Sequence, residues 1–294
     1  MKRTGETTGH IRGRDQGVPA LASMHPSAAR WIGALIRMAS THPAMTQILD
    51  VVERLQDRPY RTNCVLLGEP GTGKEGLARA LHHLMAPGTP LVRVDLGGYS
   101  DQEALAVLAG LAKEAEGGML LVEEAAGLSP RLQTALLRLL KGDAGAPSAH
   151  DRSKDRSRLN VVALTDHSLA AEVATGRFRH DLYFALARIV LTLPPLRERT
   201  QDLGAACVWI GNRILRGAGR DRELMPAQDF ARASPAERAT AVELRDDAVA
   251  ALARHDWPGN FRELEAVLER ALMLHRSTAS VGASEIDAAL AGTR

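Results

Sequence analysis

The chain has 294 residues, 45% of them hydrophobic, and a formal net charge of +2 at pH 7. This length and apolar content are enough for one large domain, one smaller domain and a sizeable core. A nearly neutral chain with 3% aromatic residues offers no electrostatic or stacking argument for a nucleic-acid partner. The sequence lacks an apolar run of about 18 residues and the apolar core of a signal peptide, so we predict a cytoplasmic protein without membrane association.

Residues 1–40 are predicted to form a tail followed by an amphipathic helix. The tail is rich in Gly, Thr, Arg and Lys and shows no periodicity. Between Ser27 and Ala39, apolar residues that include Trp31 recur on one helical face. That face either packs on the protein's own domain or docks a partner, and both interpretations remain open.

A glycine loop after the first apolar strand predicts a phosphate-binding site. A helix at Pro43–Leu55 precedes the strand, which ends at Leu67. The loop and the residue after it are Gly68, Glu69, Pro70, Gly71, Thr72, Gly73, Lys74 and Glu75. Glycines let amide N–H groups surround an anion, the following helix adds its positive dipole end, and the lysine supplies charge for the β- and γ-phosphates. Glu75 replaces the usual hydroxyl residue that contacts Mg²⁺. The alternative is a glycine turn without a ligand.

An acidic pair at the end of a second apolar strand predicts the other half of a nucleotide site. A helix at 75–85, a strand at Leu91–Val94 and a helix at Asp101–Glu116 come first. The strand that starts at Met119 then ends in Glu123 and Glu124. At the tip of a buried parallel strand, the first carboxylate would hold Mg²⁺ through water and the second would polarise the attacking water.

The remaining elements complete an α/β pattern. We predict a helix from Pro130 to about Lys141, a solvated loop at Gly142–Arg158, and strands at Asn160–Thr165 and Ile189–Leu193. Strands that alternate with helices around a phosphate loop indicate a doubly wound parallel sheet.

Four segments carry family-specific motifs: Gly68–Glu75, Gly176–Tyr183, Leu193–Arg199 and Trp257–Leu264. In this order they resemble the AAA+ domain of sigma-54-dependent transcriptional activators, the bacterial enhancer-binding proteins. The resemblance runs from about Thr41 to the end of the chain. It implies an AAA+ P-loop NTPase with an α/β nucleotide-binding domain at 41–215 and a small helical lid at 246–294. Such domains usually form a hexameric ring with ATP and Mg²⁺ between subunits.

Residues 216–245 are assigned to an insertion or linker between these two domains. The segment Leu224–Glu243 is rich in Ala, Arg and Glu. It is either an extra helix that covers the nucleotide or a solvated linker, and the composition favours the linker.

The resemblance also assigns roles to single residues. Lys74 corresponds to the phosphate lysine and Glu124 to the carboxylate that activates water. Arg179 corresponds to the arginine finger that reaches the neighbouring subunit's γ-phosphate, and Arg262 to the lid arginine that senses the same phosphate. For these arginines, and for Arg197 and Arg199, the alternative is a surface salt bridge.

One departure from the family concerns its output loop. The family's Gly-Ala-Phe-Thr-Gly-Ala loop, which engages the sigma factor, has no counterpart before the acidic strand. Residues 99–116 suffice only for one helix of about 27 Å. The receiver or sensor domain and the helix-turn-helix that often flank such domains are likewise without counterparts, so we expect a stand-alone member that does not bind DNA directly.

A second departure makes the site more acidic. Asp95 and Asp166 replace two family Asn residues, Glu123 replaces an Asp, and Ala185 replaces a second arginine finger. The site is therefore about three charge units more negative than the family pattern, at a cost on the order of 1 to 4 kcal/mol per close pair. We expect binding to survive better than hydrolysis, and an Asp95 close to Glu124 to raise one carboxyl pKa.

Two functions remain open from the sequence. The first is an AAA+ ATPase derived from a transcription regulator, whose ring remodels an unidentified protein partner. The second is a non-hydrolysing nucleotide-binding subunit that regulates or scaffolds, in a ring of its own or in a mixed ring.

Overall fold

The computed structural model describes residues 42–57, 62–142, 159–274 and 279–292. The predicted helix at Ser27–Ala39, with Trp31, lies outside these ranges, as does the predicted loop beyond Gly142. In the described part of the chain no helix is long and apolar enough to cross a membrane.

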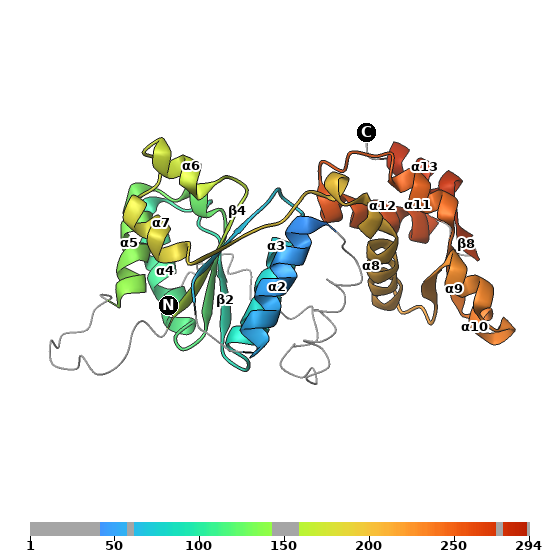
Figure 1. The fold of residues 1–294 in the computed structure, drawn as a ribbon, viewed down its shortest axis with the longest axis horizontal. Coiled ribbons are helices and arrows are strands. Elements are labelled where there is room, and N and C mark those ends of the chain that lie inside the picture. Colours follow the sequence, from blue (N-terminus) through green and yellow to red (C-terminus); the bar gives the residue numbers. More distant parts are fainter. Residues whose placement is uncertain (1–41, 58–61, 143–158, 275–278, 293–294) are drawn as a thin grey trace, which may run out of the picture.

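A five-stranded parallel sheet forms the centre of the first domain (Figure 1). Its order is β2-β3-β4-β1-β5. The strands are β1 at Cys64–Leu67, β2 at Leu91–Val94, β3 at Met119–Val122, β4 at Asn160–Thr165 and β5 at Ile189–Thr192. Strands β3 and β4 are buried along their whole length, as the apolar runs Met119–Val122 and Val161–Leu164 predict for the middle of a parallel sheet.

Helices cover both faces of this sheet, as Figure 1 shows. The helices are α2 at Pro43–Asp57 and α3 at Lys74–Met85 on one face, with α4 at Asp101–Glu114, α5 at Pro130–Lys141 and α7 at His180–Leu186 on the other. Alternate strand residues supply the two cores: Val161 and Ala163 pack toward α4 and α5, whereas Val162 and Leu164 pack toward α2 and α3. The predicted doubly wound sheet is confirmed.

Local sequence sets several helix ends. Ser100 and Glu103 form a capping box at the start of α4. Ser129 caps α5, whose first residue is Pro130, and Gly142 ends that helix in the left-handed conformation. Beyond α5, the short helix α6 at Leu169–Ala174 precedes α7.

A second unit, the lid, follows the sheet domain. Two short 3₁₀ turns, η3 at Leu196–Glu198 and η4 at Thr200–Asp202, lead into it. Its helices are α8 at Leu203–Gly217, α11 at Asp246–Leu252, α12 at Asn260–Leu274 and α13 at Ala283–Ala291. They enclose a separate core that contains the fully buried Trp257.

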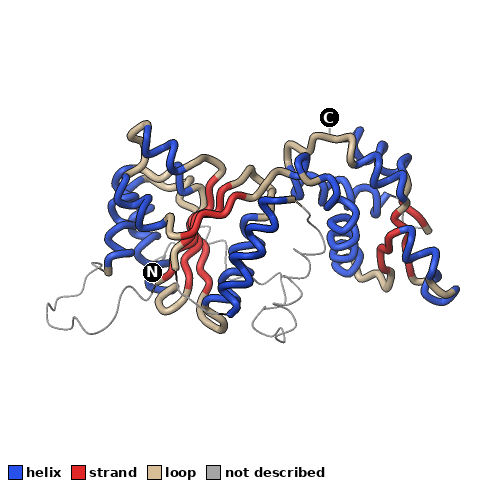
Figure 2. Tube along the Cα trace, in the orientation of Figure 1, coloured by secondary structure: helices blue, strands red, loops and turns tan. Residues whose placement is uncertain are grey.

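The expected solvated linker at Leu224–Glu243 is wrong, because this segment is folded. It contains β6 at Glu223–Pro226, α9 at Ala227–Arg232, α10 at Pro235–Ala239 and β7 at Ala241–Leu244. With β8 at Ser280–Val281 the strands form a small parallel sheet, order β6-β7-β8, drawn in red at the lid in Figure 2. Leu224, Val242 and Leu244 are buried in the lid core. Neither α9 nor α10 buries a residue, which explains the solvated composition.

Candidate nucleotide site

The predicted nucleotide residues lie at the carboxyl ends of neighbouring strands. Leu67 of β1 pairs in register with Thr165 of β4, and Val122 of β3 pairs with Ala163. The amide of Gly68 donates a hydrogen bond to the carbonyl of Thr165 at 3.1 Å. The phosphate loop, the acidic pair after β3 and Asp166 after β4 therefore share one edge of the sheet, where ligands bind in open α/β folds.

The phosphate loop needs glycine at two positions. Gly71 and Gly73 have φ angles of 80° and 103°, in the left-handed region that side chains disfavour. A Cβ atom on Gly71 would lie 2.3 Å from the carbonyl oxygen of Gly259, so this glycine also allows the lid backbone to approach. The Thr72 hydroxyl donates to the Glu69 carbonyl at 2.8 Å and fixes the turn.

Lys74 is the first residue of α3 and is buried beneath the loop. Its ammonium donates hydrogen bonds to the carbonyls of Gly68 and of Glu69, the latter at 3.1 Å. Desolvation lowers the pKa of Lys74, while the negative charges of Glu124 and Asp166 raise it. The lysine and the two carboxylates therefore belong to one electrostatic site.

Glu124 follows β3 in a strained conformation, with φ at 45°. Desolvation raises the pKa of its carboxyl group, and the negative charge of Asp166 raises it further. Asp95 acts in the same direction but is a smaller cause. Asp166 in turn pairs with His167 at 2.6 Å. The Glu124 carboxyl group therefore interacts with Asp166, and its pKa lies above the ordinary value.

Glu123, predicted to hold Mg²⁺ through water, is paired with an arginine. Its Oε1 contacts Nε of Arg93, whose Nη1 lies 3.0 Å from Oε1 of Glu75. Residues at the two positions of Glu75 and Glu123 hold Mg²⁺ in P-loop NTPases. In this chain both carboxylates pair with the positively charged side chain of Arg93. The residues present therefore do not fit Mg²⁺.

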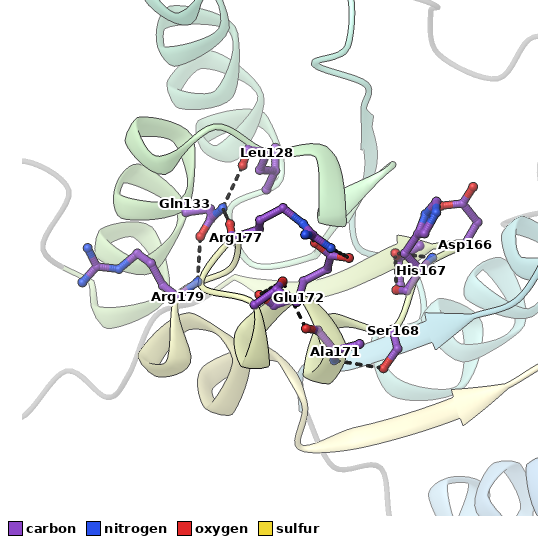
Figure 3. Close-up of polar contacts among 11 residues, drawn as sticks. Leu128, Gln133, Asp166, His167, Ser168, Ala171, Glu172, Arg177 and Arg179 are labelled. Carbon is purple, nitrogen blue, oxygen red and sulfur yellow. Dashed lines mark hydrogen bonds and ion pairs between the residues drawn. The ribbon is translucent and has the colours of Figure 1, made fainter.

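Arg179 lies at the surface in front of α7, in a segment that a buried glutamine holds. Figure 3 shows Gln133 between three backbone groups: its amide donates to the carbonyls of Leu128 and Arg177, and its oxygen accepts from the Arg179 N–H at 2.8 Å. The Arg179 side chain points away from the Asp166 and His167 pair, as Figure 3 shows. It forms a 2.8 Å ion pair with Asp181. Arg179 therefore does not join the other site residues within this chain.

The sequence did not assign a role to Gln133. The sequence did hold one indication of this role. Gln133 is a polar residue on the apolar face of α5, and a buried amide needs hydrogen-bond partners.

The lid touches the phosphate loop through the first residues of α12. The buried Asn260 donates to the Pro70 carbonyl at 3.0 Å and accepts from the Leu196 amide at 2.8 Å. Phe261 donates its amide to the Gly71 carbonyl at 3.0 Å. Arg262 is exposed beside the loop, and its positive charge lowers the pKa of Lys74. The lid arginine and the loop lysine thus face the same space, whereas the sequence did not single out Asn260.

Arg197 and Arg199 both contact the phosphate loop. Arg197 forms a two-bond pair with the Glu69 carboxylate, at 2.5 and 2.8 Å. That hydrogen bonding lowers the pKa of Glu69 to about 2. Arg199 is buried, donates to the Thr72 carbonyl at 2.8 Å and stacks on the ring of Phe261. Both arginines join the loop to the segment that leads into the lid.

Comparisons with known proteins agree with this architecture. The sigma-54 interaction domain model matches residues 40–196, and the AAA+ ATPase lid domain model matches residues 223–294. The Nif-specific regulatory protein of Azotobacter vinelandii is 30% identical over 248 residues, which are 79% of this chain and 43% of that protein. The acetoin catabolism regulatory protein of Cupriavidus necator is 35% identical over 274 residues, 86% of this chain and 37% of that protein.

Among solved structures, NtrX from Brucella abortus in complex with ATP is similar to this chain, with a TM-score of 0.68 and 26% sequence identity. The match covers 87% of this chain and 55% of the NtrX chain. The chain thus spans less than half the length of the two curated relatives. The family match extends over the phosphate loop, the acidic strand and the Arg179 segment. The chain belongs to the family of sigma-54 interaction domains of transcription regulators.

Proposed function

We propose that this chain binds ATP through its phosphate loop as an AAA+ regulator that acts on a protein partner. The observation that carries the proposal is the placement of Lys74 beneath, and of Arg262 beside, a loop with left-handed glycines. Two cations and a ring of amides suit a triphosphate. The similar NtrX structure was solved with ATP, which supports the same ligand here.

A second candidate is a subunit that binds ATP without hydrolysing it. The proximity of Glu124 to Asp166 favours this function, because the two carboxyl groups interact with each other at the position where the proposed base would hold water. The predicted Mg²⁺ is not part of either proposal, since Glu75 and Glu123 are paired with Arg93.

Assembly into a ring, of this chain alone or with a relative, is part of the proposal. Arg179 is exposed and directed away from its own site, as an arginine that serves a neighbour's nucleotide must be. The cytoplasmic location and the ring size stay predictions.

Calorimetric titration with ATP tests the binding. The wild-type chain should show saturable heat, and Lys74→Ala should remove it. Lys113→Ala, which removes an exposed lysine from α4, is the matched control and should bind like the wild type. Equal ATP affinity in wild type and Lys74→Ala would contradict the proposal. Steady-state phosphate release then separates the two candidates, because the non-hydrolysing subunit predicts no release that depends on Lys74.

The partner is proposed to differ from the sigma-54 holoenzyme. Between β2 and β3 the chain forms only α4 and its short connections, where the resemblance places the sigma-contacting loop. Addition of this protein to sigma-54 polymerase should therefore leave open-complex formation unchanged. Stimulation that depends on ATP and Lys74 would show that the partner was wrongly excluded.

A further inference from the structure

Arg93 lies between the two carboxylates that face the metal position of phosphate-loop proteins. Its Nε pairs with Glu123, and its Nη1 lies 3.0 Å from the Oε1 atom of Glu75. In P-loop NTPases generally, the residue after the loop lysine and the first acidic residue after the central strand hold the cation. One guanidinium contacts both positions in this chain.

The sheet explains why Arg93 reaches this place. Side chains alternate along a strand, and Val92 and Val94 of β2 pack against the core on the α4 face. Arg93 therefore projects to the opposite face, which α3 covers and where Glu75 lies in the first turn of that helix. In register, Arg93 lies beside Leu121, two residues before Glu123.

The charges at this position suit a guanidinium and oppose a metal ion. A guanidinium stays charged at all relevant pH values and presents several planar N–H donors, so it can serve two carboxylates at once. Mg²⁺ requires oxygen ligands in octahedral geometry and would have to displace Arg93 from both acids. The fixed positive charge of Arg93 would also repel an ion that entered beside it.

We propose that Arg93 is the resident cation of the nucleotide site and that this chain binds ATP without a divalent metal. This inference rests on the proposed ATP binding by the phosphate loop. Arg93 neutralises the carboxylates of Glu75 and Glu123, which would otherwise repel the triphosphate. The positive charge that phosphate-loop proteins take from solution is thus supplied by β2.

ATP titrations in excess EDTA and in excess Mg²⁺ test the proposal on the wild-type chain. The dissociation constants should agree within about threefold, because the cation is part of the protein. ATP binding that requires Mg²⁺ would overturn the metal-independent site while leaving the proposed function intact. Absence of ATP binding in both buffers would overturn the proposed function, and this inference with it.

Arg93→Ala supplies the complementary test. In EDTA its ATP affinity should fall by at least about tenfold, since Glu123 then loses its partner Arg93 while Glu75 keeps Arg79, and Mg²⁺ should restore it. Arg79→Ala is the matched control, because it removes a second arginine, which lies on α3 at 2.8 Å from Glu75, and leaves Arg93 in place. The control should remain independent of metal. Wild-type affinity of Arg93→Ala in EDTA would refute the role of Arg93.

Thermal unfolding establishes that each variant is folded before titration. If Arg93→Ala is unfolded, the wild-type comparison of EDTA with Mg²⁺ still decides the proposal, because it needs no substitution.

Discussion

The backbone N–H of Phe261 donates a hydrogen bond to the carbonyl of Gly71 at 3.0 Å. This bond joins the first turn of a lid helix to the middle of the phosphate loop. Asn260 adds side-chain bonds to Pro70 and to the carboxylate of Glu69, the latter at 3.2 Å. The conformation of the phosphate loop and the position of the lid are therefore coupled through short polar contacts. Four measurements test these contacts and the charges of the candidate site.

Gly71→Ala should destabilise the protein and weaken ATP binding. The φ angle of 80° costs an alanine about 1 kcal/mol or more, and the new Cβ would lie 2.3 Å from the Gly259 carbonyl oxygen. Gly76→Ala in α3 is the control, because its Cβ would meet no heavy atom within 4 Å and should add about 0.5 to 1 kcal/mol of stability. Denaturant unfolding measures both variants. A Gly71→Ala variant as stable as the wild type would contradict the close lid contact.

Asn260→Ala should lower the free energy of unfolding by about 2 to 3 kcal/mol, because it leaves the buried Leu196 amide and the Pro70 carbonyl without this partner. Glu265→Ala on the same helix removes only a surface pair with Arg213 and should change stability by less than about 1 kcal/mol. Chemical denaturation with both variants checks the difference. Similar losses in the two would mean that the Asn260 bonds contribute little.

The pair of Glu69 and Arg197 should give a pH-dependent contribution to stability. Hydrogen bonding to Arg197 lowers the pKa of Glu69 to about 2 from an ordinary value of 4.5. A carboxylate with a lowered folded pKa stabilises the fold above pH 4.5, and this contribution disappears as pH falls toward about 2. Since both side chains are partly exposed, the contribution should stay below about 1 kcal/mol.

Unfolding curves of wild type and Glu69→Gln across this pH range test the pair. The difference between them should close as pH decreases through the window. Arg197→Gln should show the same pH dependence, and the double variant should lose no more than either single variant. A difference that does not change with pH would exclude the pair as its source.

Asp166→Asn should lower the pKa of Glu124. The variant removes the negative charge that, after desolvation, most raises this pKa. Carbon-detected NMR titration of the Glu124 carboxyl group measures the change directly. Asp95→Asn is the comparison and should produce a smaller decrease, because Asp95 is the weaker cause. A larger effect from Asp95→Asn would reverse the assignment.

The contribution of Glu124 to stability changes with pH in the direction opposite to that of Glu69. A carboxyl group whose pKa is raised on folding favours the protonated form, so the contribution of Glu124 to stability falls as pH rises above its ordinary 4.5. Asp166→Asn should reduce this loss.

Local sequence was sufficient to predict the sheet domain and the glycine loop between β1 and α3. Strand β1, the loop and the start of α3 are continuous in the chain, and glycine conformation, helix dipole and strand burial depend on near neighbours. The same holds for the start of α5, where Ser129 and Pro130 fix the first turn. The fold of Leu224–Glu243 was not predicted because its two short helices bury no side chain. Their sequences therefore show no apolar face, and the short strands on either side were not recognised.

The sequence by itself thus determined which residues bear the charges of the site and which strands carry them. Only the tertiary structure decided which charges meet. Arg93 and Glu75 are 18 residues apart, and Asn260 and Glu69 are 191 apart. Neither separation can be predicted from the period of a helix or a strand. Strand order, register and the docking of the lid create these contacts. Packing therefore placed a cation between two acids and an asparagine against the phosphate loop.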